Sequence, residues 1–322
     1  MSRTRITGTG SLPGTDIEAA TRLVGQACPD LIPFPELPAR GPHAAMVGRS
    51  LALLAGLDAG YEAGEWRIAA TPGPELRRAR QTWRDDLERF QEASQGQEGT
   101  VKIGIAGPVT LSATVLRPRG GLILADRGAR RDVAQALAEG AAGLRADWAR
   151  RSAVDLMLQI DEPALPAALS GAVPTEGGYF RHRPLEQSEA AELLRSVAGE
   201  VLHVCAPGLP MSVMLDERGA GFDAIAVDAA LLSNDDQDAL ALAVERGRRV
   251  HLGLIPTASG GPVEDTDALT RRALRLAERL GLPAGSGRLV LSPACGLAGW
   301  QPAQVPAVFA ALATVAQRLD EA

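Results

Sequence analysis

Residues 101–110 read VKIGIAGPVT, a short and largely apolar run that stops at Gly107 and Pro108. Residues 155–160 (DLMLQI) form a second such run, which stops at the acidic pair Asp161 and Glu162. Continuous apolar runs of this length, bounded by Gly, Pro or charge, are typical of strands buried on both faces of a parallel sheet. Six more runs have the same character, at residues 5–10, 31–35, 201–206, 224–228, 250–255 and 289–292.

Helical patterns lie between these eight runs. Residues 16–27 begin with the capping-box signature Thr15-x-x-Glu18, and residues 267–280 end at Gly281-Leu282-Pro283, a Gly-then-Pro stop. Eight strands that alternate with helices predict an α/β fold, a single (β/α)8 TIM barrel in one domain over residues 1–322.

The longest connection, residues 37–99, is predicted to be an insertion between strands 2 and 3, with helices near residues 46–57 and 74–93. A doubly wound open sheet is the alternative architecture, because strand and helix alternation alone does not prove that a sheet closes.

Composition excludes several classes of protein. The chain has 33 Lys+Arg and 39 Asp+Glu, a net charge of −6, which argues against a nucleic-acid partner. Residues 289–317 carry no charge, but prolines interrupt them too often for a membrane span. Three cysteines and no apolar leader after Met1 predict a cytoplasmic chain with reduced thiols. The sequence leaves the oligomeric state open.

Side chains able to do chemistry gather where the predicted strands end, which is where (β/α)8 barrels place their functional residues. His203 and Cys205 are two apart on one strand, so they share a face. Asp228 ends the next strand, and Cys295 follows the last. Two thiols, an imidazole and a carboxylate suit zinc, although a buried histidine and apolar thiols in a core are the alternative interpretation.

The acidic pair Asp161 and Glu162 follows the strand at residues 155–160. Adjacent side chains of an extended chain point to opposite faces, so we expect one carboxylate to reach the site and the other to hold the loop. The alternative is a pair of acids that stabilise a helix start. Residues 7–14 resemble a phosphate loop only weakly, because Pro13 replaces the third glycine of the dinucleotide motif.

Five motifs, in order, resemble the signatures of the cobalamin-independent methionine synthase family, which belongs to a superfamily shared with uroporphyrinogen decarboxylase. They are residues 10–13 (GSLP), 107–110 (GPVT), 159–164 (QIDEPA), 203–205 (HVC) and 295–297 (CGL). The resemblance spans almost the whole chain and covers only the catalytic C-terminal barrel of that family. It therefore implies a short, single-barrel form.

The resemblance implies a Zn²⁺ ion held by His203, Cys205 and Cys295. The family's glutamate ligand falls at Asp228, whose side chain is one methylene shorter. In this family the thiol of the substrate joins the metal, so the implied substrate is a small thiol.

The implied acceptor is homocysteine. Asp161 matches the acid that holds its amine, Ser11 matches a contact to its carboxylate, and Glu36 matches a second amine contact. We take Asp161 and Glu162 as the catalytic acids that orient the substrate ammonium.

Two departures concern the methyl donor. The family has a tryptophan that stacks on folate where this chain has Thr114, and residues 253–259 (GLIPTAS) lack the family's Asp and His. The resemblance to short relatives therefore implies a corrinoid methyl-donor protein as a partner in place of folate.

The predicted function is zinc-dependent transfer of a methyl group to a small thiol, with homocysteine giving methionine. One alternative is a metal-free lyase of the porphyrinogen-decarboxylase type, which needs convergent arginines that the strand ends hardly offer. The sequence is also compatible with an epoxide:thiol alkyltransferase and with a non-catalytic zinc-binding barrel.

Overall fold

The computed structural model describes residues 3–215, 221–258, 260–282 and 286–322. Eight parallel strands form one sheet in the order β1-β10-β9-β8-β7-β6-β5-β2. They are β1 (Arg5–Ile6), β2 (Leu31–Pro33), β5 (Thr100–Ala106), β6 (Leu156–Asp161), β7 (Val201–Val204), β8 (Ala224–Asp228), β9 (Arg249–Ile255) and β10 (Leu289–Pro293). Each lies within or beside a predicted strand.

The two ends of this sheet meet just beyond β1 and β2. Ser11 and Glu36 form a parallel bridge, in which the N–H of Leu12 donates to the carbonyl of Glu36 at 2.8 Å. The N–H of Glu36 donates in turn to the carbonyl of Gly10 at 3.0 Å. The sheet therefore closes, and the predicted (β/α)8 barrel is confirmed over the open sheet.

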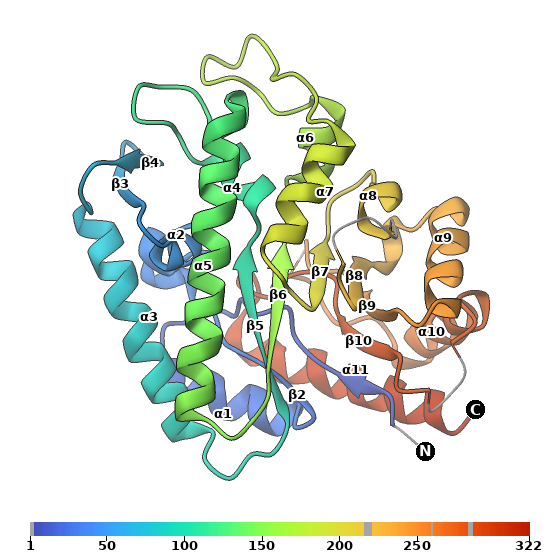
Figure 1. Ribbon diagram of the computed structural model, residues 1–322. Coiled ribbons are helices and arrows are strands. Elements are labelled where there is room, and N and C mark those ends of the chain that lie inside the picture. Colours follow the sequence, from blue (N-terminus) through green and yellow to red (C-terminus); the bar gives the residue numbers. More distant parts are fainter. Residues whose placement is uncertain (1–2, 216–220, 259, 283–285) are drawn as a thin grey trace.

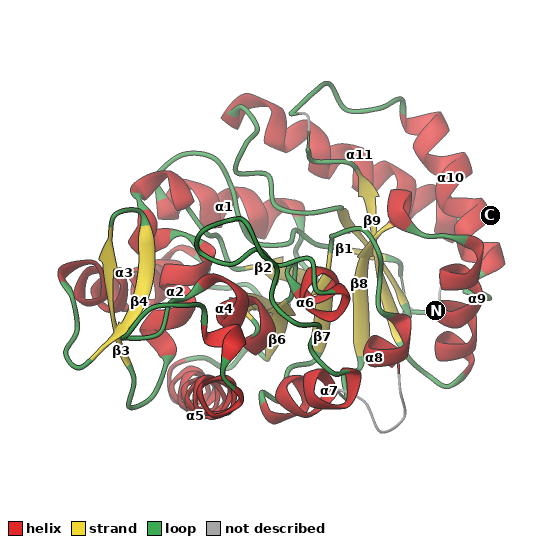
Figure 2. Cartoon of the chain, turned by 90° about the horizontal axis from the view of Figure 1, so that it is seen from above, coloured by secondary structure: helices red, strands yellow, loops and turns green. Residues whose placement is uncertain are grey.

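Helices surround the strands in both views (Figures 1 and 2). They are α1 (Ile17–Ala27), α2 (Met46–Leu53), α3 (Pro74–Ala93), α4 (Pro108–Thr114), α5 (Arg127–Arg151), α6 (Leu165–Ser170), α7 (Gln187–Ser196), α8 (Met211–Leu215), α9 (Asn234–Glu245), α10 (Thr266–Arg279) and α11 (Val305–Asp320). None of these described helices combines the length and apolarity needed to cross a membrane.

The insertion after β2 contains both predicted helices, α2 and α3, and an antiparallel hairpin that sequence reasoning missed. The hairpin pairs β3 (Asp58–Glu62) with β4 (Glu65–Ala69), and it lies outside the barrel beside α3 (Figure 2). The rings of Tyr61 and Trp66 pack across the two strands, with centroids 5.1 Å apart and planes tilted by 56°. Cross-strand aromatic pairs of this kind stabilise a two-stranded ribbon.

One predicted helix cap is wrong and one helix stop is confirmed. Asp16, not Thr15, caps α1, because its carboxylate accepts the N–H groups of Glu18 and Ala19. Gly281 ends α10 with a positive φ of 62°, a conformation that glycine adopts without strain. Pro283, the other half of that signal, lies outside the described residues.

The barrel interior changes character along its axis. One end is filled by the apolar side chains of Leu31, Met157, Val201, Ala224, Ala226 and Val290. Two residues after Met157 and Val201, the same inward face carries Gln159 and His203, which are both buried. The apolar end supports the barrel, and the polar end leads to the carboxyl ends of the strands.

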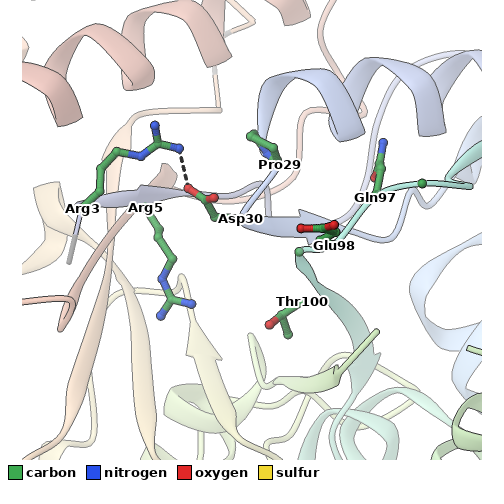
Figure 3. A pocket seen from close by; sticks show the side chains of 9 residues that line it. Arg3, Arg5, Pro29, Asp30, Gln97, Glu98 and Thr100 are labelled. Carbon is green, nitrogen blue, oxygen red and sulfur yellow. Dashed lines mark hydrogen bonds and ion pairs between the residues drawn. The ribbon is translucent and has the colours of Figure 1, made fainter. Parts of the chain in front are cut away.

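The opposite end of the barrel has a surface hollow beside the first residues of β1, β2 and β5 (Figure 3). Arg3 lines it and is already paired with Asp30 at 2.6 Å. Arg5 also lines it, and none of the predicted site residues does. The predicted site residues therefore lie away from this hollow, and His203, Cys205 and Cys295 lie at the carboxyl ends of the strands.

Candidate functional site

Three predicted metal ligands converge at the carboxyl ends of two strands. His203 lies in β7, Cys205 follows that strand directly, and Cys295 follows β10. Their ligand atoms all lie within 4.8 Å of one another, and the two Sγ atoms are 3.1 Å apart. The structure thus assembles a compact set of two sulfurs and one imidazole from residues 90 positions apart.

Asp161 holds the imidazole in place. It is the register neighbour of His203 across β6 and β7, and its Oδ1 lies 2.7 Å from His203 Nδ1. This contact leaves Nε2 as the nitrogen available to a metal, with the carbonyl oxygen of Ala294 at 3.3 Å. A carboxylate behind a histidine in this way is the usual support of a zinc ligand.

Hydrogen bonds and charge set the protonation of the cluster. The Cys205 thiol donates to Cys295, and together with His203 and the N–H of Gly296 this lowers the pKa of Cys295 to about 6 against the effect of burial. The same contact and burial raise the pKa of Cys205. Burial lowers the pKa of His203, but the hydrogen bond and charge of Asp161 outweigh it and raise that pKa.

The donor set fits zinc. Two thiols and one imidazole are borderline-soft ligands, and three protein ligands with a further position left for another donor are typical of catalytic zinc. The hydrogen bonds from Cys205 and from the N–H of Gly296 lower the pKa of Cys295 and so favour its thiolate, which is the form that binds a metal.

Asp228, predicted as the fourth ligand, is not part of this cluster. Its carboxylate accepts the N–H of Ala230 at 2.8 Å and caps the short turn Ala229–Leu231. An aspartate is one methylene shorter than a glutamate, so this side chain reaches its own turn rather than the sulfurs.

Glu162 points away from the cluster and into a helix start. Its carboxylate accepts the N–H of Val109 at 2.9 Å, and both the N–H and the hydroxyl of Thr110 at 2.6 Å. Burial raises the pKa of Glu162 to about 7 in spite of these bonds. Of the acidic pair, Asp161 therefore reaches the cluster, and the contacts of Glu162 are those of a residue that positions α4.

Ser11 and Glu36 lie near the cluster, just beyond β1 and β2, where the sheet closes. Ser11 lies against Gly296, where an added Cβ would be only 1.8 Å from its Oγ, so it neighbours Cys295. The Glu36 Oε1 atom is 2.8 Å from Nη1 of Arg49, and burial raises the pKa of Glu36. Arg49 comes from α2 in the insertion and was not predicted.

These features define a class of protein: a closed (β/α)8 barrel with a cysteine and histidine cluster of metal-binding type at the carboxyl ends of its strands. A family model described as the catalytic domain of cobalamin-independent synthase matches residues 89–318. The chain belongs to this family, and the resemblance drawn from the five motifs is confirmed. Membership supports a methyltransferase.

Solved structures agree on the fold. The chain is similar to a B12-independent methionine synthase from Shewanella sp. W3-18-1 in complex with selenomethionine, with a TM-score of 0.69 and 15% identity over 99% of this chain and 98% of that chain. It is also similar to a methyltransferase from Methanosarcina mazei, with a TM-score of 0.58 and 15% identity over 99% of this chain and 94% of that chain. Curated protein sequences give no significant match.

Proposed function

We propose that this protein is a zinc-dependent methyltransferase that moves a methyl group to the thiol of homocysteine and forms methionine. The observation that carries the proposal is the convergence of His203, Cys205 and Cys295 within 4.8 Å. These three side chains would hold the metal, with Asp161 behind the histidine. Bound zinc would supply the deprotonation of the substrate thiol at neutral pH.

The chain's own residues would bind and orient the acceptor. Asp161 would receive the substrate ammonium on Oδ2, the oxygen that faces Gly104, because Oδ1 is occupied by His203. Ser11, beside Gly296, would contact the substrate carboxylate. Fixing both groups aligns the sulfur with the donor before reaction.

The donor side of the site supports a methyl-corrinoid protein rather than folate. Thr114 ends α4, and its hydroxyl donates to the carbonyl of Thr110 at 2.7 Å, so no ring is offered for stacking at that position. In the segment at residues 253–259, the Thr257 carbonyl accepts the indole N–H of Trp300 at 3.2 Å. Ser259 lies outside the described residues.

Metal analysis of anaerobically purified protein tests the proposal. We expect one zinc per chain in the wild type and in Cys28→Ser, because Cys28 is buried in the core and is not a member of the cluster. Cys295→Ser removes one of three ligands, so the same preparation should lose most of its zinc. X-ray absorption should show one more sulfur neighbour at the metal when homocysteine is added.

Two results would contradict it. Protein that stays metal-free after incubation with zinc favours the metal-free lyase. If the protein binds zinc but homocysteine adds no sulfur neighbour to it, the result favours the non-catalytic zinc-binding barrel. If homocysteine adds a sulfur neighbour to the zinc but the protein methylates other thiols, the metal site stands and the proposed acceptor is wrong. If the protein instead alkylates a thiol with an epoxide, the metal site stands and the proposed reaction is wrong.

The contact between Gly296 and Ser11 gives a second prediction. In Gly296→Ala the new Cβ would meet Ser11 Oγ at 1.8 Å, so the hydroxyl must turn away. We expect the Kd for homocysteine on zinc-loaded protein to rise about tenfold, which corresponds to one charge-assisted hydrogen bond. Gly299→Ala is the matched control, because its Cβ would meet no atom within 4 Å. Calorimetric titration that finds equal affinity for both variants would remove Ser11 from the substrate site.

A further inference from the structure

The chain's single lysine is buried inside the barrel, beneath the cluster. Lys102 lies in β5 and is 2% exposed, and its Nζ donates to Gln159 Oε1. Both residues are on the inward face of neighbouring strands, and neither has a part in the function proposed above. A charged side chain is rarely kept fully buried unless a specific contact compensates for the lost hydration.

This contact determines how the Gln159 amide is oriented. An ammonium group can only donate, so the atom of Gln159 that faces Lys102 must be the oxygen. The amide nitrogen therefore faces the other way, where it donates to the carbonyl of Thr9 at 3.0 Å and to Asp161 Oδ1 at 2.8 Å. Both of these partners are acceptors, so the orientation is consistent at all three contacts.

The Asp161 oxygen that Gln159 holds is the same oxygen that holds the metal-binding histidine. Oδ1 accepts from Gln159 Nε2 and from His203 Nδ1, the latter at 2.7 Å. A hydrogen bond on Nδ1 decides that Nε2 is the nitrogen presented to a metal. Three successive hydrogen bonds therefore connect Lys102 to the tautomer and ring orientation of His203.

We propose that Lys102 is a positioning residue for the metal centre: through Gln159 it fixes Asp161, and through Asp161 it presents Nε2 of His203 to the metal. The proposal rests on the proposed function in one respect, that zinc is the ion held there. The positive charge of Lys102 also acts on the buried carboxylates of Asp161 and Glu36, and it offsets the repulsion between them.

Two opposing effects act on the charge of Lys102. Burial lowers its pKa to about 8, while Asp161 and Glu36 act to raise it. An apolar residue of the same length, as in Lys102→Met, would leave Gln159 Oε1 without a donor in a buried site. Gln159 would then lose one of its three polar contacts, and its hydrogen bond to Asp161 Oδ1 would be held less firmly.

Nitrogen-15 NMR of histidine in the metal-free protein tests the proposal without any activity. The chain has four histidines, and His43 and His182 serve as internal references because they lie outside this chain of hydrogen bonds. In the wild type we expect the neutral imidazole of His203 to carry its proton on Nδ1, the nitrogen that faces Asp161. In Lys102→Met we expect a measurable population protonated only at Nε2, and a zinc Kd raised about tenfold.

A second variant keeps the proposal falsifiable. Gln159→Met breaks the same connection. If Lys102 acts only through Gln159, the double variant of Lys102→Met and Gln159→Met should have the same His203 spectrum and the same zinc Kd as Gln159→Met alone. A folded Lys102→Met protein with the wild-type His203 spectrum and a zinc Kd within twofold would overturn the proposal. A wild type that binds no zinc would instead overturn the proposed function, and the NMR result would still decide the role of Lys102.

Discussion

Replacement of Glu162 with alanine is expected to lower the free energy of unfolding by about 3–5 kcal/mol. The change removes the acceptor of two backbone N–H groups and one hydroxyl at the start of α4, from Val109 and Thr110. Each buried donor left without a partner costs about 1–3 kcal/mol, and the cavity adds to this. Urea unfolding of the metal-free variants, followed by circular dichroism, measures the loss.

The isosteric variant Glu162→Gln removes the charge and replaces one accepting oxygen with an NH2 group that cannot accept, so it loses a contact that does not depend on pH, and only the pH-dependent part of the difference reports the charge. The pKa of Glu162 is about 7, above its ordinary value of 4.5, so the native state binds the proton more tightly than the unfolded chain. Its contribution to stability is complete below about pH 4.5 and is lost as pH rises through about 7. The stability of the wild type relative to Glu162→Gln should therefore fall over that range. A rise would mean that the start of α4 stabilises the carboxylate more than burial opposes it.

These experiments also decide the role of the acidic pair. If Glu162 is catalytic, the Gln variant should lose far more activity than its loss of stability explains. A residue that positions residues 107–110 would lose stability and activity together in the Ala variant.

The barrel could be predicted because its signal is local. Each of the eight barrel strands is a short apolar run that ends at a polar residue or a glycine. This pattern is expected for parallel strands that are buried on both faces. The β3–β4 hairpin was missed because its short strands do not have the continuous apolar character of the barrel strands. Their apolar residues alternate with polar or charged ones, as Ala59 and Tyr61 do in β3 and Trp66 and Ile68 do in β4, which is the pattern of a ribbon with one buried face.

The metal cluster could be predicted from strand ends and motifs, because the fold brings strand ends together. The supporting contacts could not. Arg49 reaches Glu36 from a helix in the insertion, and no spacing in the sequence relates the two. Lys102 did carry a signal, as one charge in a buried run, but its partner Gln159 is 57 residues away. The sequence therefore predicted the three residues that form the cluster, wrongly added Asp228 to it, and left out the hydrogen bonds that orient its members.

The Asp161→Asn variant is expected to show the largest effect on acceptor choice. Asn keeps an oxygen that can accept from Gln159 and His203, but it removes the negative charge proposed to hold the substrate ammonium. The comparison acceptor is 4-mercaptobutanoate, which is homocysteine without its amine. We expect kcat/KM for homocysteine to fall about 10–100-fold relative to that for 4-mercaptobutanoate, since a hydrogen bond between charged groups contributes about 1.5–3 kcal/mol.

The ratio of the two acceptors isolates the ammonium contact. Any weakening of His203 as a ligand would slow both acceptors equally, because both thiols meet the same metal centre. Glu36→Gln is the comparison variant, because Glu36 is the implied second amine contact: its carboxylate is already paired with Arg49 at 2.8 Å, so the ratio should change less than threefold. Equal losses for both acceptors in Asp161→Asn would assign Asp161 to the histidine alone. A larger change in Glu36→Gln would assign the ammonium contact to Glu36, whose carboxylate also lies against Gly104.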